Sequence, residues 1–234
     1  MDYIVEGFRS AIGIIFRFDG EMVEVVVRSL YVSFTATLIA SAVAVPFFMF
    51  LGLQRFGGEG IVSRLLNTFM SLPTVVVGLL VMLFLARRGP FGSLNLLFTV
   101  RAMIIAQVVL VFPLVSAMTY ELAKQSGRRI RSLGHTLGAN AWQATLLAIV
   151  ELKEALFIYV ITTFSRAISE VGAVMMVGGN IKGMTNVMTT TISRYNSMGE
   201  YELAIALGVI LMLTSGVINW AAYSFKEKGF RYGS

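Results

Sequence analysis

Four stretches of this chain contain no charged residue, and each is long enough to cross a lipid bilayer. They are residues 29–54, 65–86, 102–120 and 203–225. A helix needs about 20 apolar residues to span the hydrocarbon core. A fifth stretch, 155–181, has that length but contains Arg166 and Glu170. The runs are continuously apolar, without the period of two that marks the strands of a membrane barrel. The sequence therefore predicts an all-α, polytopic membrane protein with about five transmembrane helices.

The composition supports this class. Hydrophobic residues make up 56% of the 234 residues and charged residues 14%, whereas soluble domains carry about 25% charged residues. A soluble protein with a very large core is the alternative, but the charges here are segregated between the apolar runs. We expect an interfacial segment at 1–24, spans at about 27–53, 63–86, 101–121, 154–178 and 202–224, a cytoplasmic loop at about 122–153 and a cytoplasmic tail at 226–234. In the first segment, apolar residues recur at intervals of three and four, which predicts a short helix on the membrane surface.

The residue inventory excludes several kinds of site. The chain has no cysteine, and its one histidine is His135, so neither thiolates nor a histidine cluster can bind a metal. It contains no GxxxxGK[ST] phosphate loop, and we expect no bound cofactor. The net charge of +6 is attributed to Lys and Arg beside the membrane rather than to nucleic-acid binding. Asp2 and Glu6 stand where a signal peptide would be basic, so we do not expect the N-terminal segment to be a signal peptide.

The distribution of basic residues predicts the orientation, because cytoplasmic loops are richer in Lys and Arg. With the 121–154 loop and the C-terminus in the cytoplasm, ten Lys and Arg lie inside and eight outside, while Arg166 lies within a span. This difference favours an N-terminus outside and a C-terminus in the cytoplasm. The outer loops are nevertheless basic.

The segment 128–155 is polar and basic in an otherwise apolar chain, with three arginines in its first four residues. Loops of this length in compact proteins are usually functional. We expect two short helices with a turn between Gly134 and Asn140, and Trp142 in the headgroup layer. An ordinary solvated basic loop is the alternative.

Two motifs resemble those of permease subunits of ATP-driven import systems (ABC importers). Residues 166–180 read RAISEVGAVMMVGGN and resemble the R-A-[IL]-x-E-x-G-A-x-x-M-x-x-G-N segment of permeases for the oxyanions molybdate, sulfate and tungstate. Residues 71–79, SLPTVVVGL, resemble the second-span stretch of the same family core. The polar loop resembles the family's EAA loop at Gly138 and Ala139, with Ser132 in place of a glutamate. The resemblance covers about residues 25–225, which would form the transmembrane permease domain, and is nearest to the tungstate-type branch.

The resemblance implies a type I ABC importer permease core in a prokaryotic cell membrane, which would import an oxyanion by alternating access. It implies two copies of a cytoplasmic ATPase subunit, an extracytoplasmic oxyanion-binding protein, and a homodimer of the chain that encloses the path between its subunits. The loop would hold a coupling helix that contacts the ATPase. Its contact residues would be Ser132, Leu133, His135, Gly138, Ala139, Asn140 and Trp142.

Arg166 and Glu170 lie four residues apart on one face of the predicted fourth span. A charge at bilayer depth costs about 2.5–3.5 kcal/mol on insertion scales, so we expect neither side chain to face lipid. The pair is either a structural ion pair between helices or part of the translocation path or its gate. Further candidates for the path are Pro73, Gly172, Gly179 and Asn180.

Prolines and threonines mark two further features. Pro46, Pro73 and Pro113 fall within the first three predicted spans, where proline removes a backbone hydrogen bond and bends a helix. The outer loop 178–201 contains hydroxyls that either pack the loop or bind an anion. They belong to Thr185, Thr189, Thr190 and Thr191.

Two other functional classes compete with this interpretation. A self-sufficient secondary anion transporter or channel would be favoured by an inverted repeat or several buried ionisable groups, and the sequence shows one such pair and no repeat. An intramembrane enzyme would need a nucleophile with a base, or a metal site. We therefore predict a transport subunit that is not an enzyme and whose ATP hydrolysis is supplied by a separate protein.

Overall fold

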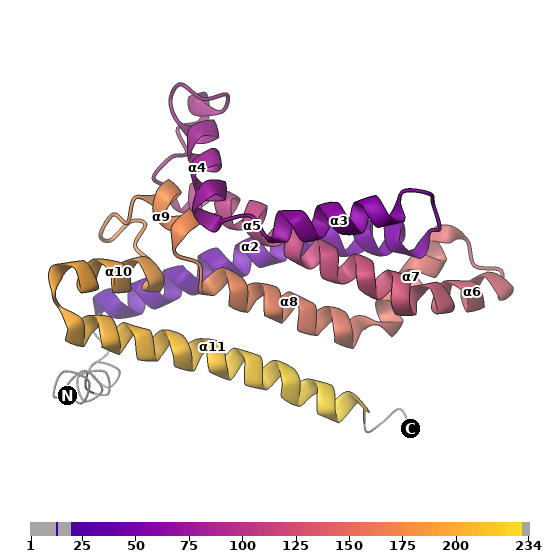
Figure 1. The fold of residues 1–234 in the computed structure, drawn as a ribbon. Coiled ribbons are helices and arrows are strands. Elements are labelled where there is room, and N and C mark those ends of the chain that lie inside the picture. Colours follow the sequence, from indigo (N-terminus) through magenta and orange to yellow (C-terminus); the bar gives the residue numbers. More distant parts are fainter. Residues whose placement is uncertain (1–12, 14–19, 231–234) are drawn as a thin grey trace. The chain divides into compact units, whose positions relative to one another are not determined.

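The structure is a computed structural model that describes Gly13 and residues 20–230, with the backbone alone for 221–230. All regular structure in these residues is helical, which confirms the all-α class (Figure 1). The interfacial helix predicted within 1–24 falls outside the described residues, except that 20–24 belong to α2. The helices are α2 (Gly20–Leu53), α3 (Glu59–Met70), α4 (Thr74–Leu85), α5 (Val100–Leu122), α6 (Arg128–Thr136), α7 (Ala141–Glu151), α8 (Lys153–Ile168), α9 (Gly172–Gly178), α10 (Met188–Met198) and α11 (Tyr201–Phe230).

Three helices are long and apolar enough to cross a membrane: Gly20–Leu53, Val100–Thr136 and Tyr201–Trp220. The other two predicted spans are each a pair of helices with a bend at a short break. The bend is 89° between α3 and α4 and 58° between α8 and α9. If each bent pair crosses the membrane once, the described part of the chain has up to five spans.

The first of these breaks is the kink that Pro73 predicts. Pro73 is extended, with φ −60° and ψ 126°, and stands immediately before α4. It has no N–H to donate, and its ring disfavours helical geometry at the residue before it. By contrast, α2 and α5 continue through Pro46 and Pro113. The second break, at 169–171, has no proline and was not predicted from the sequence.

Several helices are longer than the sequence predicted. The third span was expected to end at 121, but its helix continues through a π-helical turn, Ala123–Gly127, into α6. Gly127 does not end the helix because its backbone is right-handed, with φ −66°. Similarly, α2 begins at Gly20 and α11 continues to Phe230, inside the predicted tail. Helices in this chain therefore extend beyond the apolar runs that were used to predict them.

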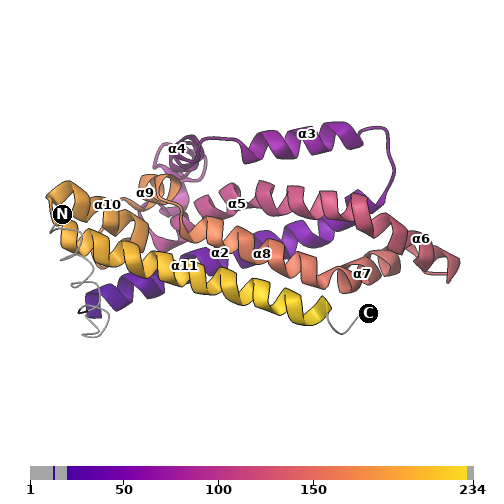
Figure 2. The same cartoon turned by 60° about the horizontal axis from the view of Figure 1, so that its bottom comes forward.

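The chain forms two compact units, described here one at a time. Unit 1 consists of the segment ending at Ala36 together with Pro73–Gln107 and Ser165–Ile218. In it, α4 and α9 lie side by side (Figures 1 and 2).

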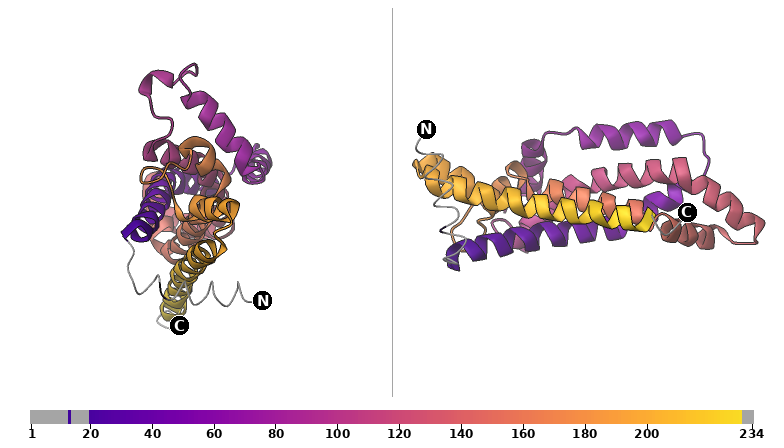
Figure 3. Two further views of the ribbon diagram at one scale, coloured as in Figure 1. Left: turned by 90° about the vertical axis from the view of Figure 1, so that its left-hand side faces the viewer. Right: turned by 90° about the horizontal axis from the view of Figure 1, so that it is seen from below.

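Unit 2 consists of Thr37–Leu72, Val108–Phe164 and the segment starting at Asn219. Here α3 lies along the end of α5 (Figures 2 and 3), where the Ser63 hydroxyl donates to Glu121 at 2.7 Å. A buried apolar cluster joins the ends of four helical segments in this unit. Its members are Met49, Leu53, Ala123, Ala148 and Leu156.

Candidate functional site

The two motifs that resemble those of importer permeases pack against each other in unit 1. Gly78 of α4 lies so close to α9 that a Cβ on it would stand 2.6 Å from the Cα of Ala173. A Cβ on Gly172 would stand 2.7 Å from Cγ2 of Val75. Carbon atoms do not approach this closely, and the first neighbour is backbone that cannot rotate away. Glycine is therefore required at Gly78 by the backbone of α9, whereas at Gly172 a larger residue would have to displace the Val75 side chain.

Glu170 and Arg166 form an ion pair at the break between α8 and α9. The Arg166 guanidinium donates to Oε2 of Glu170 at 3.0 Å. The other carboxylate oxygen accepts the backbone N–H of Ala173 at 3.2 Å, which satisfies one of the free donors at the start of α9. The Glu170 side chain is 3% exposed, whereas that of Arg166 is 46% exposed. Glu170 thus has a structural role, while the Arg166 side chain is partly exposed on the single chain.

Side chains also satisfy the carbonyls that the break releases. The Gln107 amide donates to the carbonyl of Ala167 at 2.9 Å, and the Thr189 hydroxyl donates to the carbonyl of Glu170 at 2.8 Å. Buried backbone groups need such partners, above all within a membrane. These bonds explain how an apolar segment without proline can be broken, a feature that depends on residues distant in sequence.

The predicted path residues lie at opposite ends of α9. Pro73 and Gly172 stand at the starts of α4 and α9. Gly179 and Asn180 follow the end of α9 with positive φ angles of 69° and 49°. The Asn180 amide donates to the carbonyl of Thr190 at 3.1 Å. The structure therefore does not bring the four residues together at one point.

The four threonines of the loop 178–201 are buried, and Thr185, Thr189 and Thr190 bond to backbone, whereas the Thr191 hydroxyl has no hydrogen-bond partner within the described residues. The Thr185 hydroxyl donates to the carbonyl of Gly178 at 2.5 Å and accepts the N–H of Ile181 at 3.0 Å. The Thr190 hydroxyl accepts the N–H of Val187 at 3.1 Å. These contacts agree with the interpretation in which the hydroxyls pack the loop.

Arg28 fastens the same loop to α2. Its guanidinium donates to the carbonyls of Asn186 and Gly183, both at 3.0 Å, and to the Asn186 side chain and Glu24. The ammonium of Lys182 lies 2.9 Å from Glu21, and this hydrogen bond raises the pKa of the lysine. The sequence showed that the predicted outer loops are basic, but it did not predict these contacts of Arg28 and Lys182.

In unit 2, α6 and α7 form a helical hairpin with a sharply defined corner. Gly138 has a φ of +84°. Its N–H donates to the carbonyl of His135 at 3.0 Å, and that of Ala139 donates to the carbonyl of Gly134 at 3.0 Å. This bond pattern is the Schellman motif that ends many helices. The predicted turn between Gly134 and Asn140 is confirmed.

The next residue begins α7. Asn140 and Gln143 form a reciprocal capping box, in which each side chain accepts the other residue's backbone N–H at 2.9 Å. The Schellman motif and the capping box together occupy residues 134–143 and satisfy backbone groups at both sides of the corner. The backbone of the corner is therefore specified locally.

Apolar side chains cover the outside of this hairpin. Leu137 is 86% exposed and Trp142 is 56% exposed. The other large exposed apolar residues of the hairpin are Leu133, Leu146, Leu147 and Val150. We call these six residues the corner surface. Of the other predicted coupling residues, Ser132, His135, Gly138 and Asn140 are exposed and Ala139 is half-buried.

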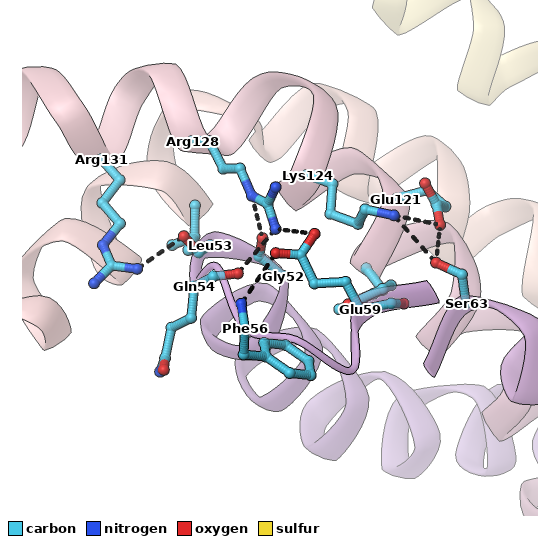
Figure 4. A network of polar contacts seen from close by, with 11 residues as sticks. Gly52, Leu53, Gln54, Phe56, Glu59, Ser63, Glu121, Lys124, Arg128 and Arg131 are labelled. Atoms are coloured by element: carbon cyan, nitrogen blue, oxygen red, sulfur yellow. Dashed lines mark hydrogen bonds and ion pairs between the residues drawn. The ribbon is translucent and has the colours of Figure 1, made fainter. Parts of the chain in front are cut away.

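Two arginines at the root of the hairpin bind the end of α2, and we call them the arginine clamp (Figure 4). Arg128 donates from Nε to the carbonyl of Gly52 at 3.0 Å and from Nη2 to that of Gln54 at 2.8 Å. The same Nη2 lies 2.8 Å from the Glu59 carboxylate. Arg131 donates to the carbonyl of Leu53 at 2.8 Å.

The clamp satisfies carbonyls that a helix end leaves free, and it puts positive charge at the negative end of the helix dipole. Helix α2 has no basic residue of its own in its last turn. Sequence reasoning recognised the arginines only as membrane-flanking. Two features of the sequence could have predicted this contact: the three arginines at the start of α6, and the last turn of α2, which has no basic residue.

Comparisons with known proteins agree with the fold and the motifs. Residues 36–228 match the profile of the family described as binding-protein-dependent transport system inner membrane component. The chain is 52% identical to the tungstate uptake system permease protein TupB of Peptoclostridium acidaminophilum, across 97% of this chain and 100% of that protein. It is 33% identical to a probable anion ABC transporter permease protein of Haloferax volcanii, across 88% and 91% of the two chains. It is 32% identical to the TupB permease of Campylobacter jejuni, across 97% and 95%.

Proposed function

The chain belongs to the family of inner membrane components of binding-protein-dependent transport systems, and from this premise we propose that it translocates tungstate. It is a multi-pass membrane permease subunit and not an enzyme, and its family implies a separate ATPase and a substrate-binding protein as partners. The choice of tungstate is supported by two relatives with that name, one of them 52% identical over its full length.

The observation that carries the importer mechanism is the corner surface. A hairpin that exposes Leu137 and Trp142 beside a locally specified corner has a clear use if another protein covers it. Buried aromatic and aliphatic anchors dominate the energy of protein interfaces. The occupant in this proposal is the ATPase subunit, and its contacts include Ser132, His135, Gly138, Ala139 and Asn140.

Arg166 supports a dimer with a path along its interface. The Arg166 side chain is 46% exposed, and its charge would be unstable against lipid. In a two-fold homodimer, the same face of each subunit meets its copy. Arg166 then faces the second subunit or an aqueous path, where its charge attracts an oxyanion, while Glu170 holds it in place. Pro73 and Gly172 lie beside the same break, and Gly179 and Asn180 lie at the outer end of α9.

The orientation follows from the docking role. The corner surface faces the cytoplasm, where ATP is hydrolysed, so the C-terminus is cytoplasmic and the N-terminus is outside. The loop 178–201, which Arg28 fastens to α2, is then on the side of the binding protein. The remaining exposed apolar side chains, such as Trp220 at 75%, contact lipid.

The test is uptake of tungstate into proteoliposomes that contain the permease and its ATPase, with the binding protein supplied outside. The proposal predicts uptake only when ATP and the loaded binding protein are both present. Molybdate and sulfate, each presented with the binding protein, are the specificity controls. Uptake that proceeds without ATP would instead identify a secondary transporter. Equal uptake of sulfate would contradict the tungstate assignment.

A further inference from the structure

The end of α2 is attached to the hairpin although the two are far apart in sequence. Residues 52–54 and 128–131 are connected by three hydrogen bonds from arginine side chains to backbone carbonyls. Arg128 also pairs with Glu59, the first residue of α3. One guanidinium therefore contacts the end of one helix and the start of the next (Figure 4).

Close backbone packing reinforces this connection. A Cβ on Gly52 would stand 2.7 Å from Cβ of Ala123 and 2.8 Å from the carbonyl oxygen of Tyr120. A Cβ on Gly127 would stand 2.7 Å from Cδ2 of Leu53. The end of α2 thus lies directly against the π-helical turn from which α6 continues. Directional hydrogen bonds and close apolar packing at one place make a joint with little freedom to slide.

We propose that the arginine clamp transmits movement of the α6–α7 hairpin to α2 and to the start of α3, and that Arg128 is the positioning residue of this joint. Helices α5 and α8 receive such movement through the chain itself, because they adjoin the hairpin in sequence. Helix α2 is not adjacent to the hairpin in sequence, so it can receive such movement only through the clamp and the packing beside it. The inference rests on the proposed function, in which the hairpin is moved by the ATPase.

The chemistry of arginine suits this role. Arg128 uses two separate nitrogens of its planar fork to reach two carbonyls and a carboxylate, and a lysine ammonium cannot reproduce this geometry. Arg131 makes one bond to α2, which a lysine can replace. The neighbouring Arg129 is exposed and makes no hydrogen bond or ion pair within the described part of the chain. It is therefore a control with the same charge on the same helix.

The experiment measures tungstate taken up per ATP hydrolysed by the reconstituted complex. The Arg128→Ala variant should still bind the ATPase subunit, because the corner surface is intact. The amount of tungstate taken up per ATP hydrolysed should fall by about three- to tenfold. Arg128→Lys should lower it nearly as much, whereas Arg129→Ala should stay near wild type. A purely structural role would reduce the amount of complex and leave the ratio unchanged. An unchanged ratio in both Arg128 variants overturns the proposal.

A second measurement follows the joint itself. The chain has no cysteine of its own, so spin labels on Gln54→Cys and Gln125→Cys report one distance. The proposal predicts the same narrow distribution in the nucleotide-free and ATP-trapped complex, and a distribution that changes between these states once Arg128 is replaced by Lys. A wild-type distance that changes between states overturns the rigid joint. Failure of the wild-type complex to couple uptake to ATP would refute the proposed function instead, and is visible before any variant is made.

Discussion

The α4–α9 contact and the α6–α7 corner both depend on glycine, for opposite reasons. Gly78 has no room for a side chain because the backbone of α9 occupies the space. Gly138 has open space around it, with no atom within 4 Å of a Cβ, but its own φ of +84° disfavours any other residue. Gly78 allows two helices of the same chain, α4 and α9, to pack closely. Gly138 forms a corner whose side chains point outward, as a docking surface requires.

The largest expected effect is at the α4–α9 contact. Gly78→Ala should destabilise the permease by about 1–3 kcal/mol, since overpacking against backbone cannot be relieved by a rotamer change. Its melting temperature in detergent should fall. Gly208→Ala on α11 is the matched control, because no atom lies within 4 Å of that Cβ. Equal melting temperatures for the two variants would show that α4 and α9 are not in close contact.

The ion pair at the α8–α9 break should behave asymmetrically. Glu170→Gln leaves a buried site without its charge-assisted bonds and should cost about 1–3 kcal/mol of stability. Arg166→Gln replaces a partly exposed guanidinium with an amide that can still donate to the buried Glu170 carboxylate, and should cost about 1 kcal/mol. If Arg166 faces the path, this second variant should reduce tungstate uptake far more than it reduces melting temperature. A larger loss of stability from Arg166→Gln than from Glu170→Gln would contradict the assigned roles.

Substitutions of Gly138 should act through the backbone conformation of the corner. Gly138→Ala should cost about 1 kcal/mol because alanine adopts a positive φ poorly, and Gly138→Asn should cost less, since asparagine tolerates this conformation. Gly138→Leu should still insert into the membrane and dimerise, but lose ATP hydrolysis stimulated by the binding protein. The assay compares stimulated hydrolysis with the amount of assembled permease. Loss of the permease itself would indicate that Gly138 serves only to turn the chain.

The smallest effect on stability is expected from Leu137→Ser. This side chain is 86% exposed, so its replacement should leave the melting temperature unchanged. The affinity of the variant permease for the ATPase should nevertheless fall by about fivefold, as for an anchor that contributes about 1 kcal/mol. The affinity is measured by titrating the ATPase against permease in nanodiscs. Normal binding of the ATPase by this variant would show that Leu137 is not part of the docking surface.

The sequence predicted features that depend on local chemistry. Apolar runs located the spanning helices, Pro73 predicted the first break, and the turn at Gly138 is set by the Schellman motif and the capping box beside it. The second break depends on Gln107 and Thr189, which stabilise it from other parts of the chain. The arginine clamp likewise joins residues 52–54 to 128–131. Such contacts between distant segments leave no periodic pattern in the sequence.

The most direct test of the account is the accessibility of the corner. Ala141 is exposed, and its side chain takes no part in the capping box. In this chain without natural cysteines, Ala141→Cys should react with a membrane-impermeant maleimide in inverted vesicles and not in intact cells. Added ATPase subunit should protect it. Labelling in intact cells, or labelling that the ATPase does not reduce, would contradict a cytoplasmic docking surface at the α6–α7 corner.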